Sequence, residues 1–206
     1  MERHHERARI FGLDRRLNAH RLFPSAMKIW VSADHHLGHA NIIKYCNRPF
    51  KDLHHMDEVL IANWNEVVAD GDLVYYLGDF TMARNAERYI ERLTGIISFM
   101  AGSHDRWLDE AITRYEGDIW SKHRFIPPLY EIKHAGKHIT LCHYAMRSWP
   151  RSFHGSYQLY GHSHGRLEAT RQPRQMDIGV DCHSYYPVLL DDVLRRLDAD
   201  AEKSLD

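Results

Sequence analysis

The sequence of 206 residues has few cysteines, no long apolar segment and almost no net charge. Its three cysteines form no CxxC pair and are odd in number, which argues against a disulfide framework and predicts a reducing, cytoplasmic location. No apolar stretch approaches the roughly 20 residues that a membrane span requires, so we expect no association with a membrane. The N-terminal residues lack an apolar run typical of a signal peptide, which predicts against secretion.

The formal net charge of −1 bears on possible partners. Tight binding of a long nucleic acid requires a strongly basic surface, so we expect no stable nucleic-acid complex, although a local basic patch stays possible. The residue type in excess is histidine, at 17 of 206. Histidine is both the commonest metal ligand and the acid–base group best matched to neutral pH, so the positions of these residues matter.

The first half of the chain alternates between strand and helix patterns. Residues 1–26 are rich in arginine, and we interpret them as a basic extension that is either an amphipathic helix or a frayed terminus; the domain proper is predicted to span 27–206. Apolar strands are predicted over 28–33, 73–77 and 96–101, and helices over 56–69 and 87–93. This alternation favours parallel strands joined by crossover helices.

The second half has a different pattern. Segments 129–134 and 138–142 flank a short Ala-Gly-Lys loop of the hairpin type, further strands are predicted over 158–160 and 176–180, and a helix over 193–197. Parallel units followed by hairpins predict an α/β fold. We expect a four-layer αββα sandwich, in which two mixed β-sheets pack face to face and are flanked by helices.

Aspartate and histidine residues follow the ends of the predicted strands. They are Asp34, Asp79, the pair Ser103-His104, His143, and the pair His162 and His164 in Gly-His-Ser-His. Each motif alone is weak, because Asp-x-His can be a turn with a surface imidazole and Gly-Asp is a turn signal. Ligands of open α/β sheets bind at the carboxyl ends of the strands, so the shared placement of these residues predicts one site.

In this order, the motifs resemble the signature of the calcineurin-like metallophosphoesterase superfamily, which runs D-x-H, G-D, G-N-H-[DE], a lone His and G-H-x-H. Here they read Asp34-His35-His36, Gly78-Asp79, Gly102-Ser103-His104-Asp105, His143 and Gly161-His162-Ser163-His164. The similarity covers roughly residues 27–187. Surrounding stretches such as DHHLGHANIIKYCNRPF are similar to a small bacterial and phage branch of that superfamily.

This resemblance implies a site for two divalent metal ions. The first ion would be held by Asp34, His36 and His164, the second by His143 and His162, and Asp79 would bridge both. Carboxylates and imidazoles without thiolates suit Mn²⁺, which we expect first, with Fe, Zn²⁺ or Ni²⁺ as alternatives. Two such ions can clamp the attacking and leaving oxygens of an in-line displacement.

The remaining motif residues receive roles in catalysis. His104 would protonate the leaving oxygen or stabilise charge on it, and Asp105 would orient that imidazole. Ser103 stands where the family has a metal-binding Asn, and a protonated hydroxyl is a poor ligand. We therefore expect weaker occupancy of the second metal position or a water in the gap, and a natural variant, an engineered weakening and a degraded site all stay open.

Two further residues are predicted to contact the substrate. His39 lies five residues after Asp34 on the same loop and could face a phosphate. Arg147 lies between His143 and the His-x-His motif, in a loop with interleaved aromatic residues that could stack on a base. His183 is interpreted as a structural or surface histidine.

The sequence thus predicts a metal-dependent phosphoesterase. It would hydrolyse a small phosphomonoester or phosphodiester, with nucleotides and cyclic nucleotides among the candidates, by in-line attack of a hydroxide that bridges the metals. A nuclease is the alternative within the enzyme class. A catalytically weakened protein-binding scaffold of the same fold is the alternative outside it, and Ser103 is the residue that favours it.

Overall fold

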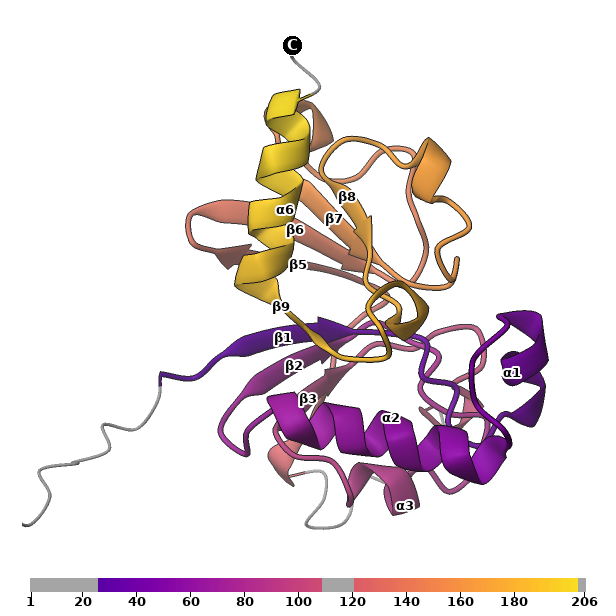
Figure 1. Ribbon diagram of the computed structural model, residues 1–206. Coiled ribbons are helices and arrows are strands. Elements are labelled where there is room, and N and C mark those ends of the chain that lie inside the picture. The colour runs from indigo at the N-terminus through magenta and orange to yellow at the C-terminus, as the bar shows by residue number, and fades with distance from the viewer. Residues whose placement is uncertain (1–25, 109–120, 204–206) are drawn as a thin grey trace, which may run out of the picture.

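A computed structural model describes residues 26–108 and 121–203, so the predicted extension over 1–26 lies outside the described residues except for its last residue. The elements in chain order are β1 (Ile29–Ser32), α1 (Ala40–Tyr45), α2 (Leu53–Val67), β2 (Leu73–Tyr76), α3 (Glu87–Ile90), β3 (Ile96–Phe99), β4 (Arg124–Phe125), β5 (Leu129–His134), β6 (Lys137–Cys142), β7 (Tyr157–Tyr160), β8 (Gln175–Asp177), β9 (Val188–Leu189) and α6 (Leu190–Lys203) (Figure 1). Within these ranges every helix is too short or too polar for a transmembrane span.

The first sheet has five strands in the order β4-β3-β2-β1-β9. Strands β1 to β4 run parallel, and the short β9 pairs antiparallel with β1 at the edge. The connection from β1 to β2 contains α2, and that from β2 to β3 contains α3, as the alternating pattern predicted. Parallel neighbours require such crossovers, because a tight turn cannot return the chain to the same end of the sheet.

The second sheet has four strands in the order β5-β6-β7-β8. Strands β5 and β6 form the predicted hairpin, whose turn residues Ala135 and Gly136 have φ angles of 48° and 79°, as a two-residue primed turn requires. Strands β6, β7 and β8 are parallel to one another. Both sheets are therefore mixed, and the predicted α/β fold with two mixed sheets is confirmed.

Alternating side chains of the strands form the two cores. On β2, Val74 and Tyr76 point toward the helix-side core, whereas Tyr75 packs against the core between the two sheets. Helix α2 closes the first core with the buried residues Met56, Asp57, Leu60, Ile61 and Trp64. Helix α6 packs against β1, β8 and β9 and buries Leu190, Val193, Leu194, Leu197 and Ala201, at the spacing of an amphipathic helix.

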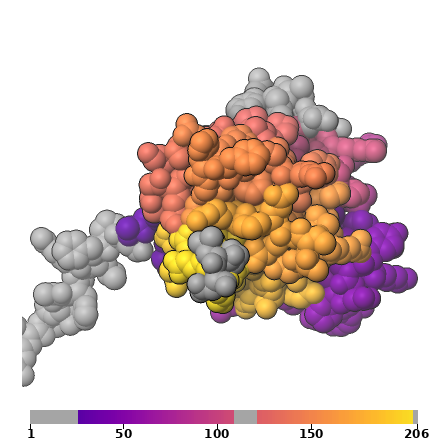
Figure 2. Space-filling view, turned by 90° about the horizontal axis from the view of Figure 1, so that it is seen from above, coloured from indigo at the N-terminus to yellow at the C-terminus, as the bar shows by residue number. Residues whose placement is uncertain are grey.

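The carboxyl ends of the parallel strands of both sheets lie on the same side of the molecule. Strands β1, β2 and β3 run toward the side on which α1 lies, and the loops after β6 and β7 reach the same region (Figure 1). From above, the second half of the chain, in orange to yellow, fills most of the visible face, with the indigo N-terminal elements at one side (Figure 2). The loops that carry the predicted site residues therefore meet on the side where these strands end.

Three short elements were not predicted. Helix α1 has six residues, and β4 and β9 have two each, so none is long enough to show a hydrophobic period. Helix α2 also begins three residues before the predicted start, at Leu53, because the carboxylate of Asp52 caps it by accepting a hydrogen bond from the amide of His55.

Candidate metal centre

The loops after β1 and β2 run side by side and hold three of the predicted ligands. The amide of Asp34 donates to the carbonyl oxygen of Gly78, and the amide of His36 donates to that of Asp79, each at 3.0 Å. The parallel pairing of the strands thus continues for two more residues beyond the sheet. This pairing fixes the distances between Asp34, His36 and Asp79 before any metal ion binds.

Five of the predicted ligands have left-handed backbone conformations. The φ angles are 60° for Asp34, 52° for His36, 56° for Asp79, 66° for His162 and 48° for His164. Aspartate and histidine tolerate this region better than most residues, but the conformation still costs on the order of 1 kcal/mol per residue. Such strain persists only where surrounding contacts impose it, and it concentrates at functional sites.

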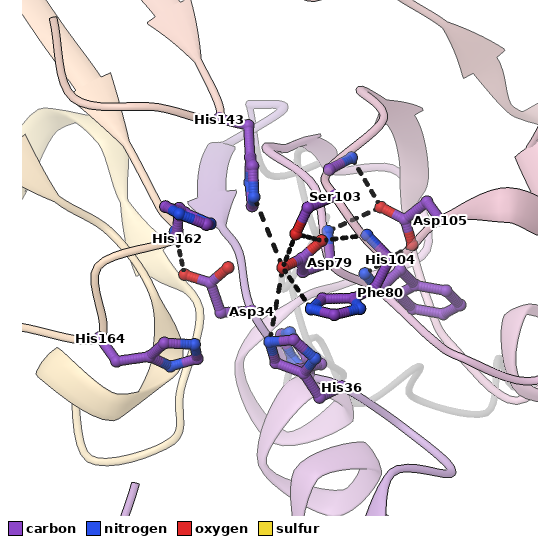
Figure 3. A network of polar contacts seen from close by, with 12 residues as sticks. Asp34, His36, Asp79, Phe80, Ser103, His104, Asp105, His143, His162 and His164 are labelled. Atoms are coloured by element: carbon purple, nitrogen blue, oxygen red, sulfur yellow. Dashed lines mark hydrogen bonds and ion pairs between the residues drawn. The ribbon is translucent and has the colours of Figure 1, made fainter. Parts of the chain in front are cut away.

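Ligand atoms gather in overlapping groups within 4.8 Å of one another. Those formed by predicted residues are Asp34–His36–His164, His36–Asp79–His104 and Asp79–His143–His162 (Figure 3). Asp79 belongs to two of them and lies at the centre of the close-up. The chain therefore has several Asp/His clusters that could hold metal ions.

Several buried polar atoms of these clusters have no hydrogen-bond partner among the described residues: Oδ1 of Asp34, both ring nitrogens of His36 and Nε2 of His143. Each such atom would cost about 1–3 kcal/mol if nothing satisfied it. Nε2 of His36 lies 3.6 Å, and Nε2 of His143 3.5 Å, from Oδ2 of Asp79. These distances exceed a hydrogen bond but approach the roughly 3–3.4 Å between two ligands of one ion at about 2.1 Å. The residues thus fit a bound cation.

The charge states suit metal binding as well. Burial raises the pKa of the Asp34 carboxyl well above its ordinary value, and the nearby carboxylates of Asp177 and Asp79 raise it further. Burial lowers the pKa of His36 to about 2 and also lowers that of His162, so both imidazoles are neutral at pH 7. Neutral imidazoles beside crowded carboxylates leave excess negative charge, which a divalent cation would offset.

A buried arginine that the sequence did not reveal supports the first group. Arg48 donates to both carboxylate oxygens of Asp181 at 2.8 Å and to the backbone oxygens of Asp34 at 2.6 Å and His35 at 2.8 Å. Asp181 in turn accepts from Nδ1 of His164 at 2.6 Å. The imidazole is thereby fixed with Nε2 left for a metal, the arrangement usual for metal-binding histidines.

Cys46 also lies within reach of His164 and Asp181, as a further possible ligand group. Burial would raise the pKa of Asp181, but hydrogen bonds from His164 and Arg48 outweigh it and lower that pKa to about 2. The guanidinium already neutralises this carboxylate, so a cation beside Cys46 would be repelled. The groups around Asp34 and Asp79 are the better cation sites.

The hydrogen-bond partners of Asp105 differ from the one that its predicted role suggests. Its carboxylate accepts the amide hydrogens of Asp79, Phe80, Thr81 and Gly102 at 2.6–3.3 Å, and the indole N–H of Trp107 at 2.9 Å. No hydrogen bond joins it to the imidazole of His104 within the described parts of the chain. Asp105 instead ties the loop after β2 to the loop after β3.

The loop after β3 places its two polar residues beside Asp79. The hydroxyl of Ser103 donates to the two carboxylate oxygens of Asp79 at 3.3 and 3.1 Å. The amide of His104 donates to Oδ1 of the same carboxylate at 2.8 Å. The imidazole of His104 is 42% exposed, with Nε2 4.0 Å from Oδ2 of Asp79. His104 thus faces solvent beside the ligand groups, while Ser103 contacts the carboxylate that they share.

A cavity of about 370 Å³ opens over the ligand groups. Its lining consists of His36, His39, Ile42, Tyr45, Cys46, Asp79, His104, His162, His164 and Arg166. His39 is therefore at the predicted place. The exposed Arg147 is not part of this lining; Arg166 is, and its guanidinium is anchored by the backbone oxygen of Tyr45 at 3.0 Å.

The aromatic residues interleaved with Arg147 in the sequence are Trp149, Phe153 and Tyr157. Trp149 and Tyr157 are 6% and 3% exposed and belong to the interior, so neither can stack on a substrate base, whereas Phe153 is 91% exposed. His183 is structural, as interpreted from the sequence, because its Nε2 donates to the backbone oxygen of Asp177 at 2.8 Å.

Two glycines allow the carboxylates to approach the backbone. A Cβ atom on Gly102 would lie 2.3 Å from the amide nitrogen and Oδ1 of Asp79, and one on Gly179 would lie 2.5 Å from Oδ2 of Asp34. Real Cβ atoms do not come so close, so both positions require glycine. Gly102 belongs to a predicted motif, whereas Gly179 comes from a distant segment and was missed.

No protein-family model matches the sequence. The uncharacterized protein MJ1445 of Methanocaldococcus jannaschii is 33% identical over 183 residues, which cover 84% of this chain and 93% of the archaeal protein. The two proteins belong to one family. The gene 66 protein of Mycobacterium phage L5 is 23% identical over 74% of this chain and 86% of its own length.

A crystal structure of a protein of unknown function, AQ665 from Aquifex aeolicus, has a related fold. It aligns with a TM-score of 0.62 and 21% sequence identity, over 82% of this chain and 98% of that protein. At this identity the likeness concerns the fold alone.

Proposed function

We propose that this protein is a metal-dependent phosphoesterase that hydrolyses a small phosphomonoester or phosphodiester. The observation that carries the proposal is the position of Asp79. Its carboxylate belongs to two ligand groups, one with His36 and His104 and one with His143 and His162. A bridging carboxylate between two sets of imidazoles is the arrangement expected of a two-metal hydrolase. The resemblance of the ordered motifs to calcineurin-like metallophosphoesterases supports the same reading.

The residues divide between the two metal positions as follows. Asp34, His36 and His164 would hold one ion, His143 and His162 the other, and Asp79 both. When bound, the ions would act as Lewis acids toward the phosphoryl group and lower the pKa of a water molecule. Mn²⁺, Fe, Zn²⁺ and Ni²⁺ all accept this nitrogen and oxygen ligand set, and we propose Mn²⁺ as the first to test.

The residues of the chain that face the cavity would handle the substrate. The imidazole of His104, which is exposed beside Asp79, would donate a proton to the leaving oxygen. The guanidinium of Arg166 keeps donors free for a phosphate oxygen, and His39 lies between His36 and Tyr45 on the same wall. A cavity of about 370 Å³ is of the size expected for a small ligand such as a nucleotide.

The test is hydrolysis of bis-p-nitrophenyl phosphate and p-nitrophenyl phosphate by the full chain with added Mn²⁺. We expect turnover by the wild type, loss of it in Asp79→Asn, and wild-type rates in Asp70→Asn, which removes an exposed carboxylate from the turn before β2. Metal analysis of the same samples should show less bound metal in Asp79→Asn only. Absence of turnover with every divalent ion would refute the proposal and favour a binding scaffold.

A further inference from the structure

A second cavity, of about 470 Å³, adjoins the metal centre on the other side of His104. It lies between the loops after β2 and β3 and is lined by Met82, Ala83, Arg84, Ser103, His104, Arg106 and Trp107. His104 is the residue that the linings of the two cavities share. The imidazole is therefore the wall between the two cavities.

Two guanidinium groups of the second cavity have no acidic partner among the described residues. Arg84 and Arg106 are exposed, and within residues 26–108 and 121–203 neither side chain makes a hydrogen bond or an ion pair. Arg92, by contrast, pairs with Glu58, and Arg171 pairs with both Glu168 and Asp200. A cavity that collects two unmatched guanidiniums has a positive potential, and an anion of suitable size would be attracted into it.

The carboxylate of Asp105 holds the walls of this cavity in place. Asp105 accepts the amides of Phe80 and Thr81 from one loop and of Gly102 from the other. The hydroxyl of Thr81 donates to the backbone oxygen of Leu37 at 2.7 Å and accepts the amide of Ala83 at 3.0 Å. The backbone that carries Arg84 and Arg106 is thus fixed relative to the metal centre, as a binding site requires.

We propose that this cavity is a subsite for a second anionic group, a carboxylate or a phosphate, on the leaving part of the substrate. The inference rests on the proposed function. If His104 protonates the leaving oxygen, the leaving group lies on the His104 side of the phosphorus atom. Whatever continues beyond that oxygen passes over the imidazole and enters the cavity, where Arg84 and Arg106 receive its charge and Met82 and Trp107 its apolar part.

The kinetic test compares two substrates that differ only in the charge on their aromatic rings: bis(4-nitrophenyl) phosphate and its analogue with one carboxylate on each ring. The measured quantity is the ratio of kcat/KM for the carboxylated over the uncharged substrate. We expect this ratio to fall roughly fivefold in Arg84→Gln and in Arg106→Gln, and further in the double variant, as exposed arginine–anion pairs allow. Arg195→Gln on α6 makes the same change of charge far from the cavity and should keep the wild-type ratio.

A binding measurement separates this inference from the proposed function. Calorimetric titration of the metal-loaded full chain with 5-hydroxy-2-nitrobenzoate, the carboxylated leaving group, should give binding that the double variant loses and Arg195→Gln retains. An inactive protein that shows this pattern would refute the phosphoesterase and keep the anion subsite. An active protein whose substrate ratio and titration are the same in the double variant would refute the subsite and keep the phosphoesterase.

Discussion

Replacement of Arg48 by methionine tests whether the buried arginine supports the metal centre. The guanidinium is fully buried and joins Asp181 to the backbone of the loop after β1. Methionine has a similar length and no charge, so it leaves Asp181, at 9% exposure, without its cationic partner. It also leaves the backbone oxygens of Asp34 and His35 without a donor.

The expected size of the effect follows from these contacts. Loss of one partner from a buried ion pair costs about 3–5 kcal/mol, and each carbonyl oxygen left without a donor adds to this in a non-additive way. We expect Arg48→Met to lower the free energy of unfolding by about 4 kcal/mol, a large part of an ordinary domain's 5–15 kcal/mol. Because Asp181 also holds His164, metal affinity should fall about 10–100-fold.

The measurements are urea unfolding of the metal-free protein and calorimetric titration with Zn²⁺. Adding Asp181→Asn to Arg48→Met removes the unpaired charge, so the double variant should lose less stability than the sum of the single variants. Arg195→Met, at an exposed position on α6, is the control for the change of residue type. If Arg48→Met loses less than about 1 kcal/mol and binds Zn²⁺ as the wild type does, the supporting role of Arg48 is refuted.

Three further predictions concern single residues. Ser103→Asn should bind the second metal ion several-fold more tightly and raise kcat/KM; unchanged metal affinity would show that the hydroxyl beside Asp79 suffices. His104→Ala should lower kcat by about 10²–10⁴-fold with unchanged metal content, and wild-type kcat would exclude its role as the acid. Burial lowers the pKa of His123, whose Nδ1 accepts the amide of Ile97, to about 4. Between about pH 6.5 and 4 the unfolded chain binds a proton that the folded chain does not, so acid should remove about 3 kcal/mol of stability. In His123→Gln, which retains an acceptor, urea midpoints should depend less on pH over this range; an equal dependence would contradict the assignment.

The sequence predicted the strands and the gathering of Asp and His residues at the strand ends, because both depend on local patterns. Asp34, Asp79 and His143 each follow a run of apolar residues that forms a buried strand, and parallel strands bring such ends to one edge. The bounds of β5 agree with the prediction at both ends, since a two-residue turn fixes the hairpin.

The contacts that support the ligands could not be predicted in this way. Arg48 and Asp181 are 133 residues apart, and neither belongs to a pattern that distinguishes it from a surface charge. Arg147 was predicted because it lies among aromatic residues in the sequence, but the fold buries Trp149, and the arginine that lines the cavity is Arg166. Likewise, the neighbours of Asp105 are backbone amides, which no residue type reveals.

The left-handed backbone at five predicted ligand positions makes the candidate metal centre a weak point in the stability of the protein. At about 1 kcal/mol each, these conformations together cost about 5 kcal/mol, which is large against the net 5–15 kcal/mol by which an ordinary domain is stable. Glycine adopts the same conformation without strain, so a ligand-to-glycine variant such as His162→Gly would remove one ligand and relieve strain at once. Selection for thermal stability alone would therefore erode this centre, and its retention across a lineage would itself be a sign that the site is used.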